Sequence, residues 1–432
     1  MSNIWIILSV SILLLFLSNV RKGFYYIIPF MILIIPASRF LYALTENADR
    51  NVLTGTITII NFIYFAYSLQ LIYQNRSKLL AIDKAILAYI LWSLFMMIVG
   101  FYSGRISVAF VAFLNTVLPM YFYFIPRFMK LDYKKMFSLI LVCFSLLLLW
   151  ETYQSAYGFF DWEYAYSAMR GEIVTSMLRK NPSGYEASFP AAMLFSVLIV
   201  LFFLKDNNTV KHKNIYIIII CLFFFVVLER TPFAAMITAP LVVIILWGSR
   251  KSKLGIRFLS AILIILIPLI FINVVIPKLD TLDKRQKRLS ELANIQNAPN
   301  WEARINRWDR ATKYLFSPQV ITGYGLGFYA GDTSYSCHRG LHNELYNQLI
   351  EYGVIGVIIL FLIYYRAILF INERNKSYLL PYFAGLLAFW IIAIVNSPFL
   401  NNTKYYHWLF IGMIVSISLS NRKNEYQLQK NG

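Results

Sequence analysis

Apolar runs that could cross a bilayer recur along the chain and are separated mostly by short polar connections. A membrane-spanning helix needs about 20 mostly apolar residues. Runs near this length occupy approximately residues 4–20, 24–44, 52–74, 85–103, 106–125, 136–155, 188–204, 215–229, 233–248, 258–277, 352–371, 378–398 and 406–420. The pattern predicts an all-α, polytopic membrane protein of about 12–13 transmembrane helices. We expect residues 1–432 to form a single integral membrane domain.

The apolar stretch at residues 215–248 is too long for one span. A single helix of this length would measure about 51 Å, against a hydrocarbon core of about 30 Å. Two short arms joined in a tight hairpin at residues 229–232 fit the bilayer better, and Pro232 suits the first turn of the second arm. This interpretation places Arg230 at the outer edge of the membrane.

The composition excludes a soluble enzyme. Only 14% of the 432 residues are charged and 59% are hydrophobic, whereas a soluble domain carries about 25% charged residues. The formal net charge of +19 would suit a nucleic-acid-binding protein. In a membrane protein, however, basic residues in short loops mark the cytoplasmic side.

Basic residues concentrate in alternate connections, which are residues 21–22, 76–78, 127–135, 205–213, 250–257 and 366–376 and the tail after residue 420. We therefore expect these connections and the C-terminus to be cytoplasmic and the N-terminus to lie outside. The two long connections then both lie outside. We expect residues 156–187 to form a first outer loop and residues 278–351 a large extracytoplasmic loop with short amphipathic helices.

The large loop contains arginines at helical spacing. Arg304, Arg307 and Trp308 are three and four residues apart, which predicts an amphipathic helix near the membrane surface. Its basic face could contact lipid headgroups, or it could bind an anion, because arginine pairs bidentately with phosphate. Arg230 suits anion binding too, since a charge at the membrane edge is costly without a partner.

Two of the four histidines, His338 and His342, lie shortly before residue 352. A zinc site would need further ligands at set spacings, and only Cys337 lies nearby. We therefore expect no metal and favour an acid–base histidine. The glycine-rich residues 323–327 predict a turn rather than a phosphate-binding loop, because no strand clearly precedes them.

These histidines belong to a recognisable pattern. His342 and Asn343 are followed after nine residues by Gly353 and after two more by Gly356. This arrangement resembles the motif shared by the bacterial O-antigen ligase and O-antigen polymerase family.

Other residues follow the order of that family over about residues 155–370. Arg170 resembles the arginine of its earlier outer loop, and Arg230 resembles its membrane-edge arginine. Arg304 with Trp308 is similar to its arginine-bearing loop helix. Gly353 and Gly356 are expected to permit close helix packing rather than to take part in chemistry.

The resemblance implies an integral-membrane glycosyltransferase of the bacterial inner membrane. Such an enzyme transfers a glycan from undecaprenyl diphosphate to a sugar hydroxyl on the periplasmic face, without a cofactor, nucleotide sugar or essential metal. Its partners are the undecaprenyl-diphosphate-linked oligosaccharide, membrane lipid and, for some members, a chain-length regulator. Nucleic acid is not among them.

The resemblance also suggests a role for each candidate residue. His342 would act as the base, and Arg230 and Arg304 would meet the charge of the diphosphate. The residues expected to bind substrate are Arg170, Arg307, Asn343, His338 and Trp308.

Three functions stay open at this point. The first is a polymerase of O-antigen or capsular repeat units, and the second is a ligase that transfers the finished chain to the lipid A core. A polysaccharide flippase or transporter is the third, although such proteins commonly show internal repeats and no repeat is apparent here.

Overall fold

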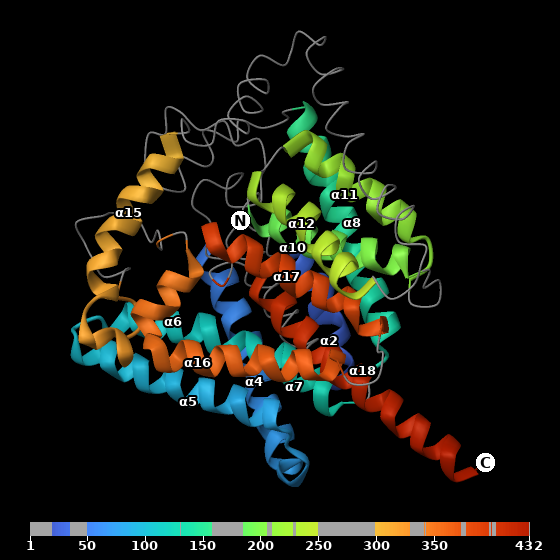
Figure 1. Ribbon diagram of the computed structural model, residues 1–432, viewed down its shortest axis with the longest axis horizontal. Coiled ribbons are helices and arrows are strands. Elements are labelled where there is room, and N and C mark those ends of the chain that lie inside the picture. The colour runs from blue at the N-terminus through green and yellow to red at the C-terminus, as the bar shows by residue number, and fades with distance from the viewer. Residues whose placement is uncertain are drawn as a thin grey trace.

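The computed structural model describes residues 20–34, 50–129, 131–157, 185–204, 210–227, 230–248, 299–328, 341, 343–372, 377–396, 399 and 403–431. Throughout these ranges the regular secondary structure is helical, and no strand occurs in them (Figure 1). The predicted all-α class is confirmed.

The elements, with short helical turns labelled η, are α2 (Val20–Pro29), η1 (Phe30–Ile34), α4 (Arg50–Gln74), η2 (Arg76–Lys78), α5 (Ala81–Tyr102), α6 (Ile106–Val117), η3 (Leu118–Met120), α7 (Tyr121–Phe128), α8 (Tyr133–Tyr157), α10 (Tyr185–Phe203), α11 (Lys213–Val227), α12 (Arg230–Gly248), α15 (Pro299–Leu315), η7 (Pro318–Ile321), α16 (Glu344–Asn372), η8 (Ser377–Leu379), α17 (Leu380–Val395) and α18 (Thr403–Asn431).

The apolar runs that fall in the described ranges are helical. Within these ranges, five helices are long and apolar enough to cross a membrane, namely Thr56–Gln74, Ala81–Tyr102, Ile106–Phe128, Tyr133–Tyr153 and Glu344–Ile371. Shorter apolar helices are Gly23–Leu33, Ala187–Phe203, Lys213–Phe224, Thr231–Leu246 and Leu380–Ile394. The polytopic membrane architecture is confirmed, while the predicted runs 4–20 and 258–277 lie outside the described residues.

Helix α10 lies in the core of the bundle, because residues 187–201 are all buried. Helices α17 and α12 pack along it. A helix that is apolar almost all round can be stable only when it is surrounded in this way. Elsewhere α5 and α16 lie side by side (Figure 1) and expose apolar side chains, as a lipid-facing surface would.

The predicted hairpin over residues 215–248 exists as two helices that pack mainly on other partners. Helix α11 packs against α8 and α10, whereas α12 packs against α17 and α10. The arms approach each other at the rings of Phe224 and Phe233, whose centroids are 6.4 Å apart. Pro232 lies in the first turn of α12, as expected. The two separate short arms that we predicted are therefore present, and each finds most of its apolar contacts on neighbouring helices.

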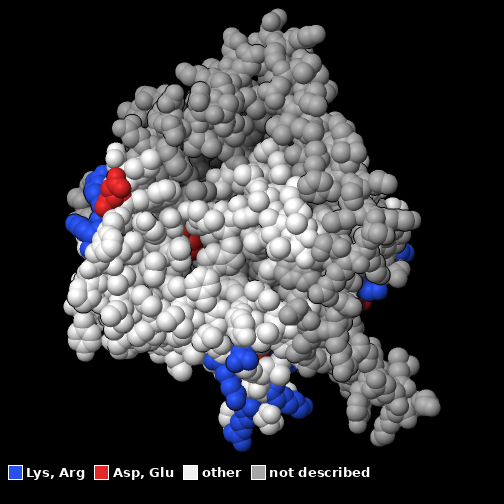
Figure 2. Space-filling view, viewed as in Figure 1, with Lys and Arg blue, Asp and Glu red and all other residues white. Residues whose placement is uncertain are grey.

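Most charged side chains lie at the edges of the face in Figure 2, and an acidic side chain is visible in a hollow nearer its centre. Basic residues gather at its lower edge, over the turn between α4 and α5 that contains Arg76 and Lys78. A second group of mixed sign lies over α15. The described surface between them is almost free of charge, as expected where helices face lipid.

Helix α16 is broken at Gly353, which has φ 71° and ψ 177°. This backbone region is accessible essentially only to glycine. The break leaves nearby carbonyls without their usual partners, and backbone groups from the glycine-rich turn supply them. The Tyr324 N–H donates to the Ile350 carbonyl at 2.8 Å, and the Gly325 N–H donates to the Glu351 carbonyl at 3.2 Å.

The third consecutive carbonyl is also satisfied from outside α16. The indole Nε1–H of Trp92 on α5 donates to the Tyr352 carbonyl at 2.8 Å. A Cβ added to Gly323 would lie 2.7 Å from the Glu351 carbonyl oxygen and from the Gly353 nitrogen. The glycine-rich residues therefore form a packed turn against the break, which confirms the predicted turn.

The two arms of α16 fold towards each other across this break. Glu344 and Tyr364 would be about 30 Å apart in a straight helix. They interact electrostatically instead, which requires the first arm to lie back over the second.

We predict that Gly353→Ala strongly destabilises the protein. The added Cβ would meet the Gly323 nitrogen at 2.5 Å and the Ile321 carbonyl oxygen at 2.6 Å, so about 3 kcal/mol or more should be lost from strain and overpacking. Gly104 is a matched control, because its φ is +77° and no atom lies within 4 Å of an added Cβ.

Gly104→Ala should cost only about 1–2 kcal/mol. Thermal unfolding of the purified protein in detergent measures both variants. Equal losses in the two variants would contradict the close-approach argument.

Candidate active site

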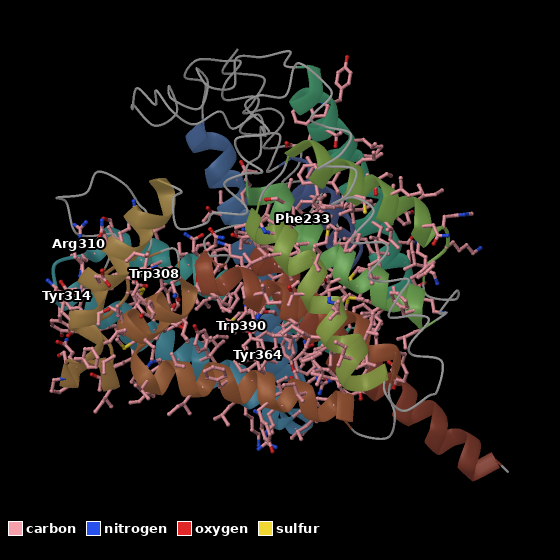
Figure 3. All side chains as sticks on the ribbon, turned by 45° about the horizontal axis from the view of Figure 1, so that its top comes forward. Phe233, Trp308, Arg310, Tyr314, Tyr364 and Trp390 are labelled. Atoms are coloured by element: carbon pink, nitrogen blue, oxygen red, sulfur yellow. The ribbon has the colours of Figure 1, made fainter. Side chains whose placement is uncertain are left out.

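Helix α15 is held against the start of α16 by a small apolar cluster. Ala311, Leu341 and Ile350 are buried together, and Trp308 and Tyr346 pack against them. The Trp308 Nε1–H donates to the Leu341 carbonyl at 2.8 Å. Figure 3 shows Trp308 on the side of α15 that faces the bundle. The helix predicted from the spacing of Arg304, Arg307 and Trp308 is therefore present and anchored.

The start of α16 is fixed by two asparagines. The Asn343 Oδ1 accepts a hydrogen bond from the Tyr346 N–H at 3.1 Å, which is the usual N-cap interaction. The Asn347 Oδ1 accepts one from the Leu341 N–H at 3.3 Å. Residues 344–351, which we had assigned to the outer loop, thus form the first arm of a helix, because this cap starts α16 at Glu344.

Arg105, at the N-terminal end of α6, ties the glycine-rich turn to the bundle. Its Nη2–H donates to the Tyr324 carbonyl at 2.9 Å, and its guanidinium lies 4.8 Å from the centre of the Phe328 ring. Burial lowers the pKa of Arg105, and the Glu351 carboxylate opposes this shift. The turn, α15 and the first arm of α16 are therefore held together.

Beneath the first arm of α16 lies a buried polar network. The Tyr89 hydroxyl donates to the Gln348 Oε1 at 2.7 Å, and the Gln348 Nε2–H donates to the Glu344 Oε1 at 3.0 Å. Tyr89 also stacks on Tyr352, with ring centroids 5.5 Å apart. This network fixes one oxygen of a carboxylate that is only 3% exposed.

The beginning of α18 supplies a cation and a histidine to the same region. The Lys404 ammonium donates to the Asn115 Oδ1 at 2.9 Å and interacts electrostatically with the Glu344 carboxylate. One turn further along, His407 Nε2 contacts the Tyr364 hydroxyl. Figure 3 shows Tyr364 and Trp390 close together, and their ring centroids are 5.1 Å apart.

Several buried polar atoms in this region have no hydrogen-bond partner among the described residues. They are the Glu344 Oε2, both amide atoms of Asn396, the Thr403 Oγ1 and the His407 Nδ1. An unsatisfied buried polar group costs about 1–3 kcal/mol. Such groups occur where a ligand or water completes the hydrogen bonding.

The structure places the predicted site residues unevenly. Arg307, Trp308 and Asn343 are described, and all three lie at or beside the junction of α15 and α16. Arg230 begins α12 and Arg304 lies in α15, but their side chains are outside the described part. Arg170, His338 and His342 lie outside the described residues altogether.

Sequence reasoning missed Glu344, Lys404 and Asn396. Glu344 and Gln348 are four residues apart, which places them on one face of a helix, but the stretch was interpreted as loop. Lys404 is a lone basic residue between two apolar runs, and its sequence context does not point to a site. Asn396 lies near the end of the predicted apolar run 378–398 and carries no chemical signal of its own.

Comparison with known proteins supports the resemblance found in the sequence. Residues 215–361 match the model of a protein family described as O-antigen ligase. This segment includes α11, α12, α15, the glycine-rich turn and the first arm of α16 with its break. No curated protein matches the chain.

We predict that Asn343→Ala lowers the thermal stability of the protein, because it removes the N-cap of α16. The expected loss is about 1 kcal/mol. Asn343→Ser should retain most of this stability, since a serine hydroxyl can also accept the hydrogen bond from residue 346. Thermal unfolding of the two variants in detergent tests the cap. A serine variant as unstable as the alanine variant would contradict it.

Proposed function

We propose that this chain, whose residues 215–361 match the model of a family described as O-antigen ligase, is a membrane glycosyltransferase that uses a lipid-linked glycan donor. The donor is a glycan on undecaprenyl diphosphate, and the acceptor is a sugar hydroxyl on another glycan. The reaction takes place on the periplasmic face of the bacterial inner membrane and involves no metal. The observation that carries this proposal is the family match across the junction of α15 and α16.

The site offers the features that such a reaction requires. Helix α15 carries Arg304 and Arg307 and is anchored beside the first arm of α16 through Trp308. A lipid diphosphate would leave with its negative charge close to the headgroup region, where fixed cations stabilise it. Arg230 and Arg304 are the proposed cations, with Arg170 and Arg307 as additional donor contacts.

The transfer step requires only one base, which removes the proton of the acceptor hydroxyl. The acceptor oxygen forms a bond to the anomeric carbon while the bond from that carbon to the diphosphate oxygen breaks. Undecaprenyl diphosphate leaves with the electron pair, and His342 takes the hydroxyl proton. Asn343 caps α16, so we propose that it supports His342 by fixing the chain beside it. His338 and Trp308 are proposed to line the glycan path.

We favour a polymerase that joins lipid-linked repeat units, assisted by a chain-length regulator. A ligase that transfers the chain to the lipid A core is the second candidate. The matched family is described as O-antigen ligase, which supports this candidate. Both candidates use the same donor chemistry and differ only in the acceptor.

Deletion of the gene in its host separates these functions. For a polymerase we expect surface core glycolipid that carries a single repeat unit, whereas loss of a ligase leaves uncapped core. Electrophoretic size display of the glycolipid is the measurement. Accumulation of repeat units on the cytoplasmic leaflet would contradict both proposals and indicate a flippase.

Variants of the proposed catalytic residues test the mechanism in purified protein. His342→Ala should bind the lipid-linked donor normally but lose nearly all transfer, by about 100-fold or more. Arg230→Ala should raise the KM for the donor by about 10- to 100-fold, because a hydrogen bond to a charged group is lost.

Arg310→Ala is the control for these variants. Arg310 is an exposed arginine of α15, and its substitution should leave donor use unchanged. Wild-type transfer by His342→Ala would remove His342 from the mechanism, and an Arg230→Ala variant that resembles Arg310→Ala would remove Arg230 from the donor site.

A further inference from the structure

Three buried polar side chains at the ends of three helices lack partners for their polar atoms. They are Glu344 at the start of α16, Asn396 just after α17, and Thr403 at the start of α18. Their exposed fractions are 3%, 2% and 0%. The Glu344 Oε2, the Asn396 amide and the Thr403 hydroxyl find no hydrogen-bond partner in the described residues. We refer to these three residues as the polar subsite.

Contacts of the intervening chain bring these helix ends towards one another. Phe399, which lies between Asn396 and Thr403 in sequence, interacts through its backbone N–H with the Glu344 carboxylate as a hydrogen-bond donor. Lys404, next to Thr403, interacts electrostatically with the same carboxylate. Helices α16 and α18 are also in contact. The polar subsite is therefore assembled by tertiary packing rather than by one local segment.

In the described part of the chain, the Glu344 Oε1 accepts a side-chain hydrogen bond, whereas no side-chain donor reaches Oε2. Gln348 donates to Oε1 and is itself held by Tyr89, so the orientation of the carboxylate is fixed. The Oε2 atom can only accept hydrogen bonds while it is ionised. A matching ligand must therefore present hydroxyl or other donor groups to it.

Charge argues against the donor diphosphate at this position. A phosphate oxygen near Oε2 would place two or more negative charges in a poorly solvated region, and the single Lys404 ammonium nearby would offset only part of their repulsion. A sugar hydroxyl carries no charge, and its hydrogen bond to a carboxylate is among the stronger ones in proteins. The Asn396 amide and the Thr403 hydroxyl can each both donate and accept hydrogen bonds. They could therefore pair with further hydroxyl groups of the sugar.

Buried aromatic rings pack near these helix ends and hold them in place. Tyr89 and Tyr352 stack beneath the first arm of α16, and Phe399 packs against Phe389 with ring centroids 4.9 Å apart. In Figure 2 an acidic side chain is visible at the bottom of a hollow in the uncharged face, between the positions of α15 and α17 in Figure 1.

We propose that the polar subsite binds the acceptor sugar, with the Glu344 Oε2 accepting hydrogen bonds from its hydroxyl groups and with Asn396 and Thr403 completing the contacts. This inference rests on the proposed function, since only Asn343 separates Glu344 from His342, the base that must reach the acceptor hydroxyl. Glu344 is a binding residue in this scheme, and the proton still goes to His342.

The test uses two probes from the host strain that lacks this gene. One is its lipid-linked oligosaccharide, and the other is the free oligosaccharide that mild acid releases from the diphosphate. Glu344→Gln keeps the shape of the side chain and can keep an acceptor for Gln348, but it removes the charge. We expect its Kd for the free oligosaccharide to rise by about 10- to 100-fold.

The acceptor KM should rise by a similar factor in Glu344→Gln, with a smaller change in kcat. Glu351→Gln is the matched control, because it removes a carboxylate from the same arm of α16, and it should bind the free oligosaccharide like the wild type. Arg230→Ala should weaken binding of the lipid-linked probe only. If Glu344→Gln does not fold, Asn396→Ala carries the test, with an expected loss of about tenfold.

Wild-type binding of the free oligosaccharide by both Glu344→Gln and Asn396→Ala would overturn the polar subsite, and would indicate that water satisfies these groups. Wild-type protein that binds the free oligosaccharide but transfers nothing from the lipid-linked probe would instead contradict the proposed function. The two failures are therefore distinguishable.

Discussion

The architecture depends on one constraint, which is that a helix inside a membrane protein cannot break unless every freed backbone group finds a new partner. Helix α16 breaks at Gly353, and the three carbonyls before the break are satisfied by Tyr324, Gly325 and Trp92. Two of these donors belong to the glycine-rich turn and one belongs to α5. The break therefore exists only when the turn and α5 are both docked, which couples local backbone geometry to the packing of the bundle.

This coupling determines which helices and side chains lie at the candidate site. The break folds the first arm of α16 back, so that Glu344 interacts electrostatically with Tyr364 on the second arm and with Lys404 on α18. Helix α15 is anchored to the same arm through Trp308. A single glycine conformation thus positions an arginine-bearing helix on one side of the arm and a buried carboxylate on the other. Movement of the arm would displace both together.

The sequence was informative where hydrophobicity or backbone geometry decides the outcome. Apolar runs predicted the helices, arginine spacing predicted α15, and the turn at residues 323–327 followed from its glycines. It failed for the first arm of α16, because Glu344 and Gln348 are polar and suggested a loop. Their polarity is used in a buried network with Tyr89, 259 residues away from Gln348. Such a partnership depends on tertiary packing and has no local signature.

The arrangement of charge also explains how one site could handle an anionic donor and a neutral acceptor. Two like charges 4 Å apart repel by about 4 kcal/mol near a protein surface, and Lys404 offsets only part of this repulsion, so separating a diphosphate from the Glu344 carboxylate is favourable. One sugar ring placed between them achieves this separation. If arginines hold the diphosphate and Glu344 holds the acceptor, the anomeric carbon must lie between the two groups. The direction of attack then follows from electrostatics, because an acceptor bound on the arginine side would place its glycan against the leaving group.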